Sequence, residues 1–472
     1  MKIYDRLYGE MSFPPIIQEL LNCPGLLRLR DVRMANNQFV AFPAFASSSR
    51  YEHSIGVCYL AGLCATSLNL SEKDTIELMM ACLYHDVGTP PFAHAMEDVL
   101  QAEFGFDHEQ NLKNLIMGTT GEFDGDMVQI FQDESIKLRS VCHSKKGRDL
   151  ELDLYRIAKI AAGDKDELLS PLLNGNGMDL DNIDNVIRAS SAMGLIDPAD
   201  VTLATRLSQA FIIEDGQVFY DASYASDLRK WQNIRDIQYT AIFESVDDFA
   251  YQTMIKKALN LVLKDKNSSQ LIDKNSWKLT DSSIVSDFLL KHQKSKEIIK
   301  RVLLCKPFHC LGVLYVQGSG VSRYINLHLE EIEQIASECF ISTLGIDKEQ
   351  KKISSLPINP VSANFYPDKR KRQLLGKALF WNVERTLDKS EDTPEGALLG
   401  LFTPLSNSNY KDEVSADGTK KRKVISFRSN NLSQLIQLLS DSVLENFNVS
   451  IYGRDSDERL TTNSTGDQLG LF

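Results

Sequence analysis

Residues 50–57 read Arg-Tyr-Glu-His-Ser-Ile-Gly-Val, and residues 84–94 read Tyr-His-Asp-Val-Gly-Thr-Pro-Pro-Phe-Ala-His. The second stretch follows apolar residues at positions 76, 79, 80 and 83, which is the period of one buried helical face. The first stretch begins another apolar helix. If these neighbouring helices pack antiparallel, the imidazole of His53 at the start of one meets the imidazole of His85 at the end of the other. The sequence therefore predicts a site between two helices.

The residues in these stretches form a metal-binding pattern when a distant carboxylate is added. The candidate ligands are His53, His85, Asp86 and Asp181. Imidazoles and carboxylates suit one divalent ion, which could be Mn²⁺, Mg²⁺, Fe²⁺, Co²⁺, Ni²⁺ or Zn²⁺. Four protein ligands leave room on such an ion for water and a phosphate oxygen. A lone histidine is more often a satisfied core residue, but the combination favours a hydrolase.

Three further residues near the pattern could transfer or hold a proton. They are His94, Glu97 and His108. An imidazole can donate a proton to a leaving oxygen near neutral pH, and a carboxylate can fix the tautomer of that imidazole. We therefore take these three as candidate catalytic residues.

These segments resemble the HD-domain metal phosphohydrolases, and more closely the SAM-and-HD-type deoxynucleoside triphosphate triphosphohydrolases. Residues 50–57 are similar to that group's Arg-Phe-Glu-His-Ser-Leu-Gly-Val, and residues 179–184 are similar to its Asp-Val-Asp-Lys-x-Asp. Residues 85–94 are similar to its His-Asp-hydrophobic-Gly-His-Gly-Pro-Phe-Ser-His. The likeness covers residues 1–195 well and continues weakly to about residue 255.

The resemblance implies roles for the residues already singled out. The four candidate ligands would bind one metal, and Arg50 would contact a substrate phosphate. His94 would be the general acid, and Glu97 would pair with His108. The family also points to a homo-oligomer.

The chain departs from the family at the positions that contact the nucleotide. Thr89 stands where the family's loop usually has a histidine that contacts phosphate. Asn182 and Asn185 replace a lysine and a tyrosine that face the nucleotide in relatives. With Arg50, these are the candidate substrate-binding residues. The metal-binding pattern is intact, whereas the positions that would read a deoxynucleotide differ.

We expect a mainly α protein with a helical HD catalytic core, a smaller mixed α/β C-terminal lobe and a flexible tail. The expected parts are residues 1–304 (with the motifs in 50–188), residues 305–455 and residues 456–472. In the lobe, Leu311–Val316 and Val424–Phe427 are expected to be strands, and Leu329–Phe340 is expected to be a helix.

Composition limits the kinds of protein that the chain can be. Of the 472 residues, 43% are hydrophobic and 25% are charged, which is ordinary for a soluble globular protein. No apolar run is long enough to span a membrane, and the start of the chain lacks a signal-peptide pattern, so we expect a cytoplasmic protein. The net charge of −12 argues against a surface that binds nucleic acid along its whole length.

Other segments suggest partners. The last five residues include Gln468, Leu469, Leu471 and Phe472 and resemble the bacterial sliding-clamp-binding peptide, although they could instead fold onto their own domain. Basic clusters at 369–372 and 420–423 could contact nucleic acid phosphates or a triphosphate. The second cluster is also similar to a nuclear import signal, and solvated loops are the commoner explanation for both. Residues 305–310 could form half of a zinc site, but no second ligand pair follows.

The leading functional prediction is hydrolysis of a dNTP to deoxynucleoside and triphosphate. One alternative is an HD-type nuclease or phosphodiesterase that acts on DNA or cyclic nucleotides. Another is a catalytically silent nucleotide sensor or clamp-bound adaptor that keeps the metal for stability.

Overall fold

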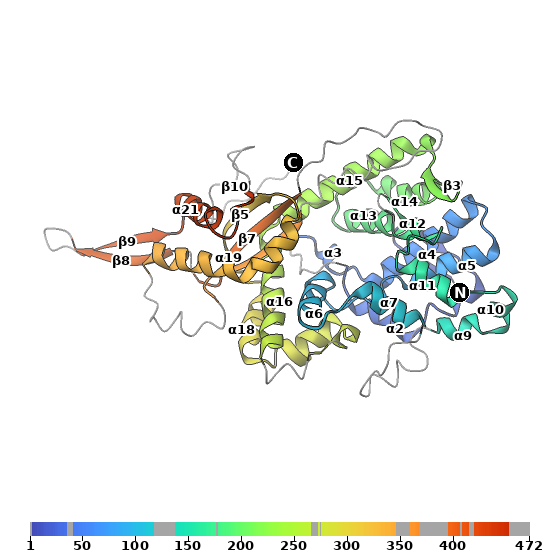
Figure 1. Cartoon of the computed structure of the whole chain (residues 1–472), viewed down its shortest axis with the longest axis horizontal. Coiled ribbons are helices and arrows are strands. Elements are labelled where there is room, and N and C mark those ends of the chain that lie inside the picture. The colour runs from blue at the N-terminus through green and yellow to red at the C-terminus, as the bar shows by residue number, and fades with distance from the viewer. Residues whose placement is uncertain are drawn as a thin grey trace. The chain divides into compact units, whose positions relative to one another are not determined.

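The computed structural model describes most of the chain. The described residues are 2–34, 41–117, 137–175, 178–265, 272–273, 275–345, 359–367, 395–405, 408–414 and 420–452. They are mainly helical, as the sequence predicts (Figure 1). The chain divides into two compact units: a helical unit, mainly Met1–Asp248 and Ile255–Cys305, and an α/β unit, mainly Phe249–Met254, Lys306–Lys369 and Asp392–Phe472.

The helical unit contains most of the helices and two small hairpins. Its α-helices are α1 Pro15–Gln18, α2 Pro24–Arg28, α3 Pro43–Ala46, α4 Arg50–Ser67, α5 Glu72–Tyr84, α6 His94–Phe104, α7 His108–Met117, α9 Leu138–Cys142, α10 Lys145–Asp149, α11 Leu154–Ala161, α12 Ser170–Leu173, α13 Leu180–Ala192, α14 Thr202–Leu207, α15 Ala225–Glu244, α17 Asp281–Ser283 and α18 Gln293–Leu303. The antiparallel hairpins pair β1 (Ile3–Asp5) with β2 (Gly9–Met11), and β3 (Phe211–Glu214) with β4 (Gln217–Tyr220). Helix α16 (Val246–Lys264) contributes residues to both units.

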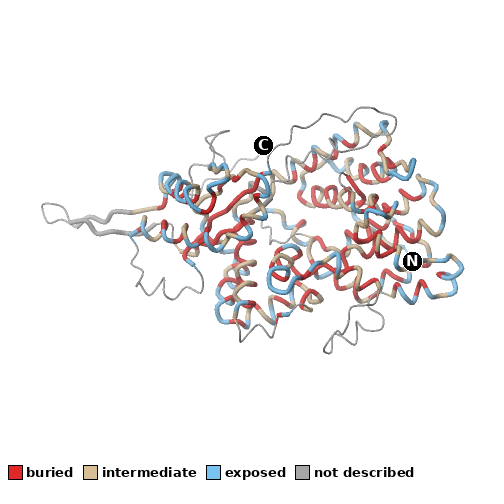
Figure 2. Tube along the Cα trace, viewed as in Figure 1, coloured by how far each residue is buried: buried red, intermediate tan, exposed pale blue. Residues whose placement is uncertain are grey.

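Side-chain caps set the starts of the helices that build the site. Ser49 accepts a hydrogen bond from the backbone N–H of Glu52 at the start of α4, and Asp179 accepts one from Asn182 at the start of α13. Helices α4, α5 and α13 are largely buried (Figure 2). Helix α4 packs against both of the others. Polar side chains on these helices are therefore held inside the unit.

The α/β unit is built on a four-stranded antiparallel sheet in the order β10-β5-β7-β6. The strands are β5 His309–Gln317, β6 Ser362–Pro367, β7 Gly396–Thr403 and β10 Asn448–Ile451. Helices α19 (Val321–Leu344) and α21 (Ser429–Ser440) share a hydrophobic core with the sheet. A separate antiparallel hairpin pairs β8 (Ser408–Val414) with β9 (Lys420–Ser426).

The structure agrees with several expected elements of this unit. The expected strand at 311–316 lies in β5, and the expected helix at 329–340 lies within α19. The strand expected at 424–427 overlaps β9, which begins at Lys420 and ends at Ser426, so Phe427 lies outside it. Among the described helices, none combines the length and the apolar character needed to cross a membrane.

Candidate metal centre

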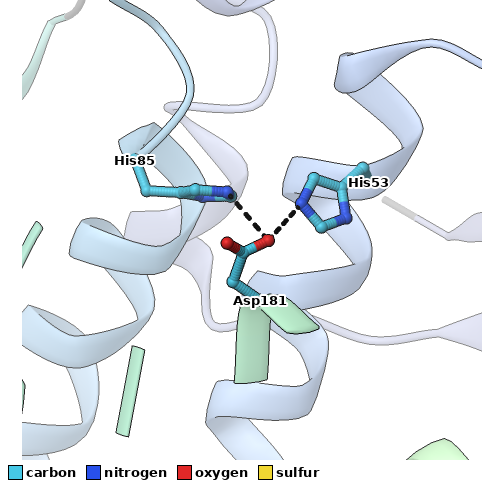
Figure 3. Close-up of side chains that lie close together, drawn as sticks. All are labelled: His53, His85 and Asp181. Atoms are coloured by element: carbon cyan, nitrogen blue, oxygen red, sulfur yellow. Dashed lines mark hydrogen bonds and ion pairs between the residues drawn. The ribbon is translucent and has the colours of Figure 1, made fainter. Parts of the chain in front are cut away.

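Three side chains from separate helices converge at one point (Figure 3). His53 comes from the first turn of α4, His85 from the C-terminal end of α5, and Asp181 from the first turn of α13. His53 Nε2 lies 2.8 Å from Asp181 Oδ1, and His85 Nε2 lies 3.7 Å from the same oxygen. The two imidazole centroids are 5.2 Å apart. One ligand atom from each residue lies within 4.8 Å of the others, which is a spacing that one cation could bridge.

Asp86 faces the same point and is held by its neighbours. Its Oδ2 lies 3.6 Å from His85 Nε2 and 4.0 Å from His53 Nε2. Its Oδ1 accepts hydrogen bonds from Arg50 Nη1 at 2.6 Å and from Thr89 Oγ1 at 3.1 Å. Burial alone would raise the pKa of Asp86, but the positive charge of Arg50 brings the pKa well below its usual range. Asp86 is therefore ionised at neutral pH.

Two atoms at this point lack hydrogen bonds within the described part of the chain: His85 Nε2 and Asp86 Oδ2, both of them buried. His85 Nδ1 donates to the backbone carbonyl of Cys82 at 2.7 Å, so in a neutral ring Nε2 carries a lone pair. A buried lone pair and a buried carboxylate oxygen without donors are costly. A divalent cation would satisfy both atoms, and the nitrogen and oxygen donors fit such an ion.

A second carboxylate lies behind His53. Asp184 Oδ1 accepts a hydrogen bond from His53 Nδ1 at 2.7 Å, and Asp184 Oδ2 accepts one from the Tyr8 hydroxyl at 2.6 Å. Arg188 binds both oxygens of Asp184 and also reaches Asp5. A carboxylate in this position fixes the tautomer of a metal-binding histidine. Nε2 of His53 is therefore left to face Asp181.

The close approach of α4 to α13 depends on a glycine. A Cβ atom on Gly56 would lie 2.2 Å from Asp184 Oδ2 and 2.5 Å from Arg188 Nη2. Both of these side chains are completely buried. The glycine in the stretch 50–57 thus leaves the space in which the Asp184 carboxylate binds His53.

The site favours positive charge. Burial alone would lower the pKa of His53, but the hydrogen bonds with Asp181 and Asp184 raise it to about 10. Burial alone would raise the pKa of Asp181, but the hydrogen bond with His53 and the nearby imidazoles of His53 and His85 bring the pKa well below its usual range. Carboxylates that stabilise a proton at this point would also stabilise a metal cation.

The candidate catalytic residues form a group of their own. Glu97, in the first turn of α6, binds His94 Nδ1 at 3.1 Å and also binds His108 Nδ1. Burial alone would raise the pKa of Glu97, but the hydrogen bonds from His108 and His94 lower it to about 2. The bond with Glu97 raises the pKa of His108 above its ordinary value. The side chain of His94 is 70% exposed and can reach a ligand from solvent.

The candidate substrate-binding residues differ in their contacts. Arg50 and Thr89 both donate to Asp86. The side-chain amide of Asn182 donates to both oxygens of Asp179 at 2.9 Å, so it supports the start of α13. Asn185 is partly buried on α13.

Sequence reasoning missed the support behind His53. The spacing of Asp184 and Arg188 by four residues on a helix was a usable signal, because such pairs lie on one face. No local pattern singled out Tyr8, which reaches Asp184 across 176 positions of sequence.

Several predicted sites fall outside what the structure describes. The tail residues Gln468, Leu469, Leu471 and Phe472 and the basic cluster at 369–372 lie outside the described residues. For the cluster at 420–423 only the backbone is described, and it is part of β9. Cys305 is exposed and Cys310 is partly buried, and neither forms a disulfide bond with another described cysteine.

Comparison with known proteins finds similar sequences. The HD domain family model matches residues 50–139. The chain is 26% identical over 393 residues to the deoxynucleoside triphosphate triphosphohydrolase SAMHD1 homolog of Dictyostelium discoideum, covering 77% of this chain and 70% of that protein. It is 33% identical over 119 residues to deoxynucleoside triphosphate triphosphohydrolase SAMHD1 of Bos taurus, covering 23% of this chain and 20% of that protein.

The fold is also similar to a solved structure. A hypothetical protein from Aquifex aeolicus superposes with a TM-score of 0.57 at 20% identity, over 85% of this chain and 96% of that one. The matched HD segment contains His53, His85 and Asp86, and Asp181 joins them from α13. Residues 50–139 therefore match the HD domain family, and the chain resembles the SAMHD1 group of phosphohydrolases.

Proposed function

We propose that this chain is a metal-dependent phosphohydrolase that acts on nucleotides, with dNTPs as its substrates. The observation that carries the proposal is the buried pair His85 Nε2 and Asp86 Oδ2, which have no hydrogen-bond partner among the described residues and face Asp181 and His53. The HD-domain match and the similarity to relatives named as dNTP triphosphohydrolases support this class of reaction.

The reaction needs water, a phosphate ester and a proton donor. A divalent cation held by His53, His85, Asp86 and Asp181 would polarise a phosphate oxygen and lower the pKa of water near it. The water oxygen attacks the α-phosphorus and loses a proton, and the bond between that phosphorus and the 5′-oxygen breaks. The 5′-oxygen takes up a proton and leaves as deoxynucleoside, while the other product is triphosphate.

The chain supplies charge and a proton for this step. Arg50 is a cation beside the candidate ligands, and a guanidinium suits phosphate oxygens. His94 is the proposed acid, because its Nδ1 is bound to Glu97 and its Nε2 can point to the leaving oxygen. His108 would keep Glu97 ionised and oriented.

The test is product identification from separate substrates. The purified full chain with Mn²⁺ is incubated with dNTPs, single-stranded DNA or cyclic nucleotides, and the products are separated by ion-exchange chromatography. Deoxynucleoside and triphosphate from dNTPs alone would support the proposal. Mononucleotides from DNA or from cyclic nucleotides would replace it with the nuclease or phosphodiesterase alternative.

One observation favours a second candidate, a catalytically silent nucleotide sensor. Thr89 stands where the family resemblance expects a phosphate-contacting histidine, and its hydroxyl donates to Asp86. A sensor would bind dNTPs without turnover, and His94→Ala would leave binding unchanged. An enzyme would lose most of its turnover in His94→Ala.

The remaining partners are also proposals. A homo-oligomer predicts a mass above that of one chain in light scattering. Clamp binding through Gln468–Phe472 predicts that removal of these residues abolishes co-elution with a purified sliding clamp. The cytoplasmic location stays a prediction.

A further inference from the structure

The loop between Asp86 and His94 contains a strained turn. Phe92 has φ 53° and Ala93 has φ 43° with ψ −122°. Residues other than glycine rarely adopt such angles, because the Cβ atom then crowds the backbone. These two residues directly precede His94, the first residue of α6, and both are buried. Something else in the fold must hold this turn in place.

A distant carboxylate binds the strained turn. Asp281 Oδ1 accepts a hydrogen bond from the backbone N–H of Phe92 at 2.8 Å, across 189 positions of sequence. Asp281 is only 5% exposed, and Thr280 caps the short helix that begins at Asp281. The carboxylate is therefore fixed where the turn needs an acceptor.

The same carboxylate also reaches the approach to α4. Asp281 Oδ2 accepts a hydrogen bond from the backbone N–H of Arg33 at 3.2 Å. Arg33 forms an isolated β-bridge with Ser49, and Ser49 caps α4, which carries His53. Asp281 thus binds both the turn that precedes His94 and the segment that precedes α4.

A buried arginine, Arg28, joins the Asp86 end of the loop to the segment that precedes Asp281. Arg28 Nη2 donates to the carbonyls of Val87 at 2.9 Å and Thr89 at 2.7 Å. Arg28 Nη1 donates to the carbonyls of Trp277 at 3.0 Å and Leu279 at 2.9 Å. Burial lowers the pKa of Arg28 to about 10, so it stays charged at neutral pH. We call residues 277–281 the brace.

We propose that the brace is a positioning element for His94. Asp281 of the brace and Arg28, which binds the brace, fix the loop between Asp86 and His94. Asp281 holds the strained turn at the His94 end, and Arg28 holds the loop at the Asp86 end. Neither residue touches the reacting atoms. The catalytic part of this inference rests on the proposed function, whereas the structural part does not.

The structural part is tested by hydrogen exchange of peptides covering residues 86–96, which needs no activity. Asp281→Ala should speed exchange in this loop, because the Phe92 N–H loses its acceptor. Asp287→Ala is the control, because that carboxylate lies shortly after the brace, in residues Ile284–Leu289, and is 55% exposed. If residues 86–96 exchange hydrogen at the same rate in Asp281→Ala, in Asp287→Ala and in the wild type, the proposal that the brace holds this loop is wrong.

The catalytic part is tested by kcat in two backgrounds. Asp281→Ala should lower kcat by about ten- to a hundredfold while Mn²⁺ content stays as in the wild type. In the His94→Ala background the same substitution should change kcat by less than about twofold, since the residue acts through His94. An equal loss in both backgrounds would overturn the positioning role. If Asp281→Ala does not fold, Asp281→Asn, which keeps one acceptor oxygen, replaces it in both tests with smaller effects of the same sign.

The two failures can be told apart. A wild type without turnover on any substrate contradicts the proposed function, but loop exchange still tests the brace. A wild type with turnover and an unchanged loop in Asp281→Ala contradicts the brace alone.

Discussion

His53 and Asp184 lie 2.7 Å apart, measured from Nδ1 to Oδ1, on the side of the imidazole that faces away from Asp181. The carboxylate is completely buried, and its charge is balanced by Arg188. A buried carboxylate beside Nδ1 requires a proton on that nitrogen. The orientation of His53 toward a cation is therefore set from behind, by residues that would not touch the ion.

Asp184→Asn should weaken metal binding. The amide can still accept from His53 Nδ1 only if its NH₂ group faces the Arg188 guanidinium, where two donors oppose each other. We expect the affinity for Mn²⁺ to fall by about ten- to a hundredfold, measured by isothermal titration calorimetry. Glu52→Gln is the control, since Glu52 is the exposed neighbour of His53. An unchanged affinity in Asp184→Asn would remove the positioning role of this carboxylate.

Gly56→Ala and Gly62→Ala, both on α4, should have opposite effects on stability. The new methyl group at Gly56 would lie 2.2 Å from Asp184 Oδ2, and overpacking a buried site costs about 1–3 kcal/mol. At Gly62 the methyl group would meet only the flexible end of Met79 at 3.4 Å, and alanine favours a helix by about 0.5–1 kcal/mol. Urea unfolding of both variants measures the difference. Equal stabilities would contradict the packing argument.

Added Mn²⁺ should raise the Tm of the wild type but not that of a variant that lacks Asp181. Asp181 Oδ1 lies 2.8 Å from His53 Nε2 and 3.7 Å from His85 Nε2, so Asp181→Ala removes the oxygen between them. After chelation and dialysis, added Mn²⁺ should raise the Tm of the wild type by ligand linkage and leave that of Asp181→Ala unchanged. A similar rise in both proteins would show that the ion binds elsewhere.

The pair of Glu97 and His108 should stabilise the protein most at mildly acidic pH. The pKa of Glu97 is lowered to about 2 from 4.5, so its contribution is complete above 4.5 and is lost as pH falls toward 2. The pKa of His108 is raised above 6.5, so its contribution is complete below 6.5 and is lost as pH rises through the raised value. The window is therefore between 4.5 and 6.5.

A double-mutant cycle with Glu97→Gln and His108→Gln measures this coupling by urea unfolding across the pH range. The coupling free energy should decrease as pH rises above about 6.5, where His108 of the unfolded chain begins to lose its proton while the folded protein still holds it. A coupling that increased with pH would contradict the assignment.

The parts of the fold that follow local periodicity could be predicted from the sequence. Antiparallel packing of α4 and α5 brings His53 beside His85, because each histidine lies at a helix end fixed by its local sequence. The β3–β4 hairpin was not predicted, although Asp215-Gly216 between apolar residues is a typical turn signal, and both residues have positive φ. The brace could not be found in this way, since its bonds to the loop join residues far apart in the chain and depend on tertiary packing.

The β1–β2 hairpin also has a practical consequence. Tyr8, in its turn, and Asp5, at the end of β1, bind Asp184 and Arg188. Proteolytic trimming of the first ten or so residues would leave a buried guanidinium and carboxylate open to water. An amino-terminal deletion would thus remove the support behind His53 without changing any residue of the stretches 50–57 and 84–94.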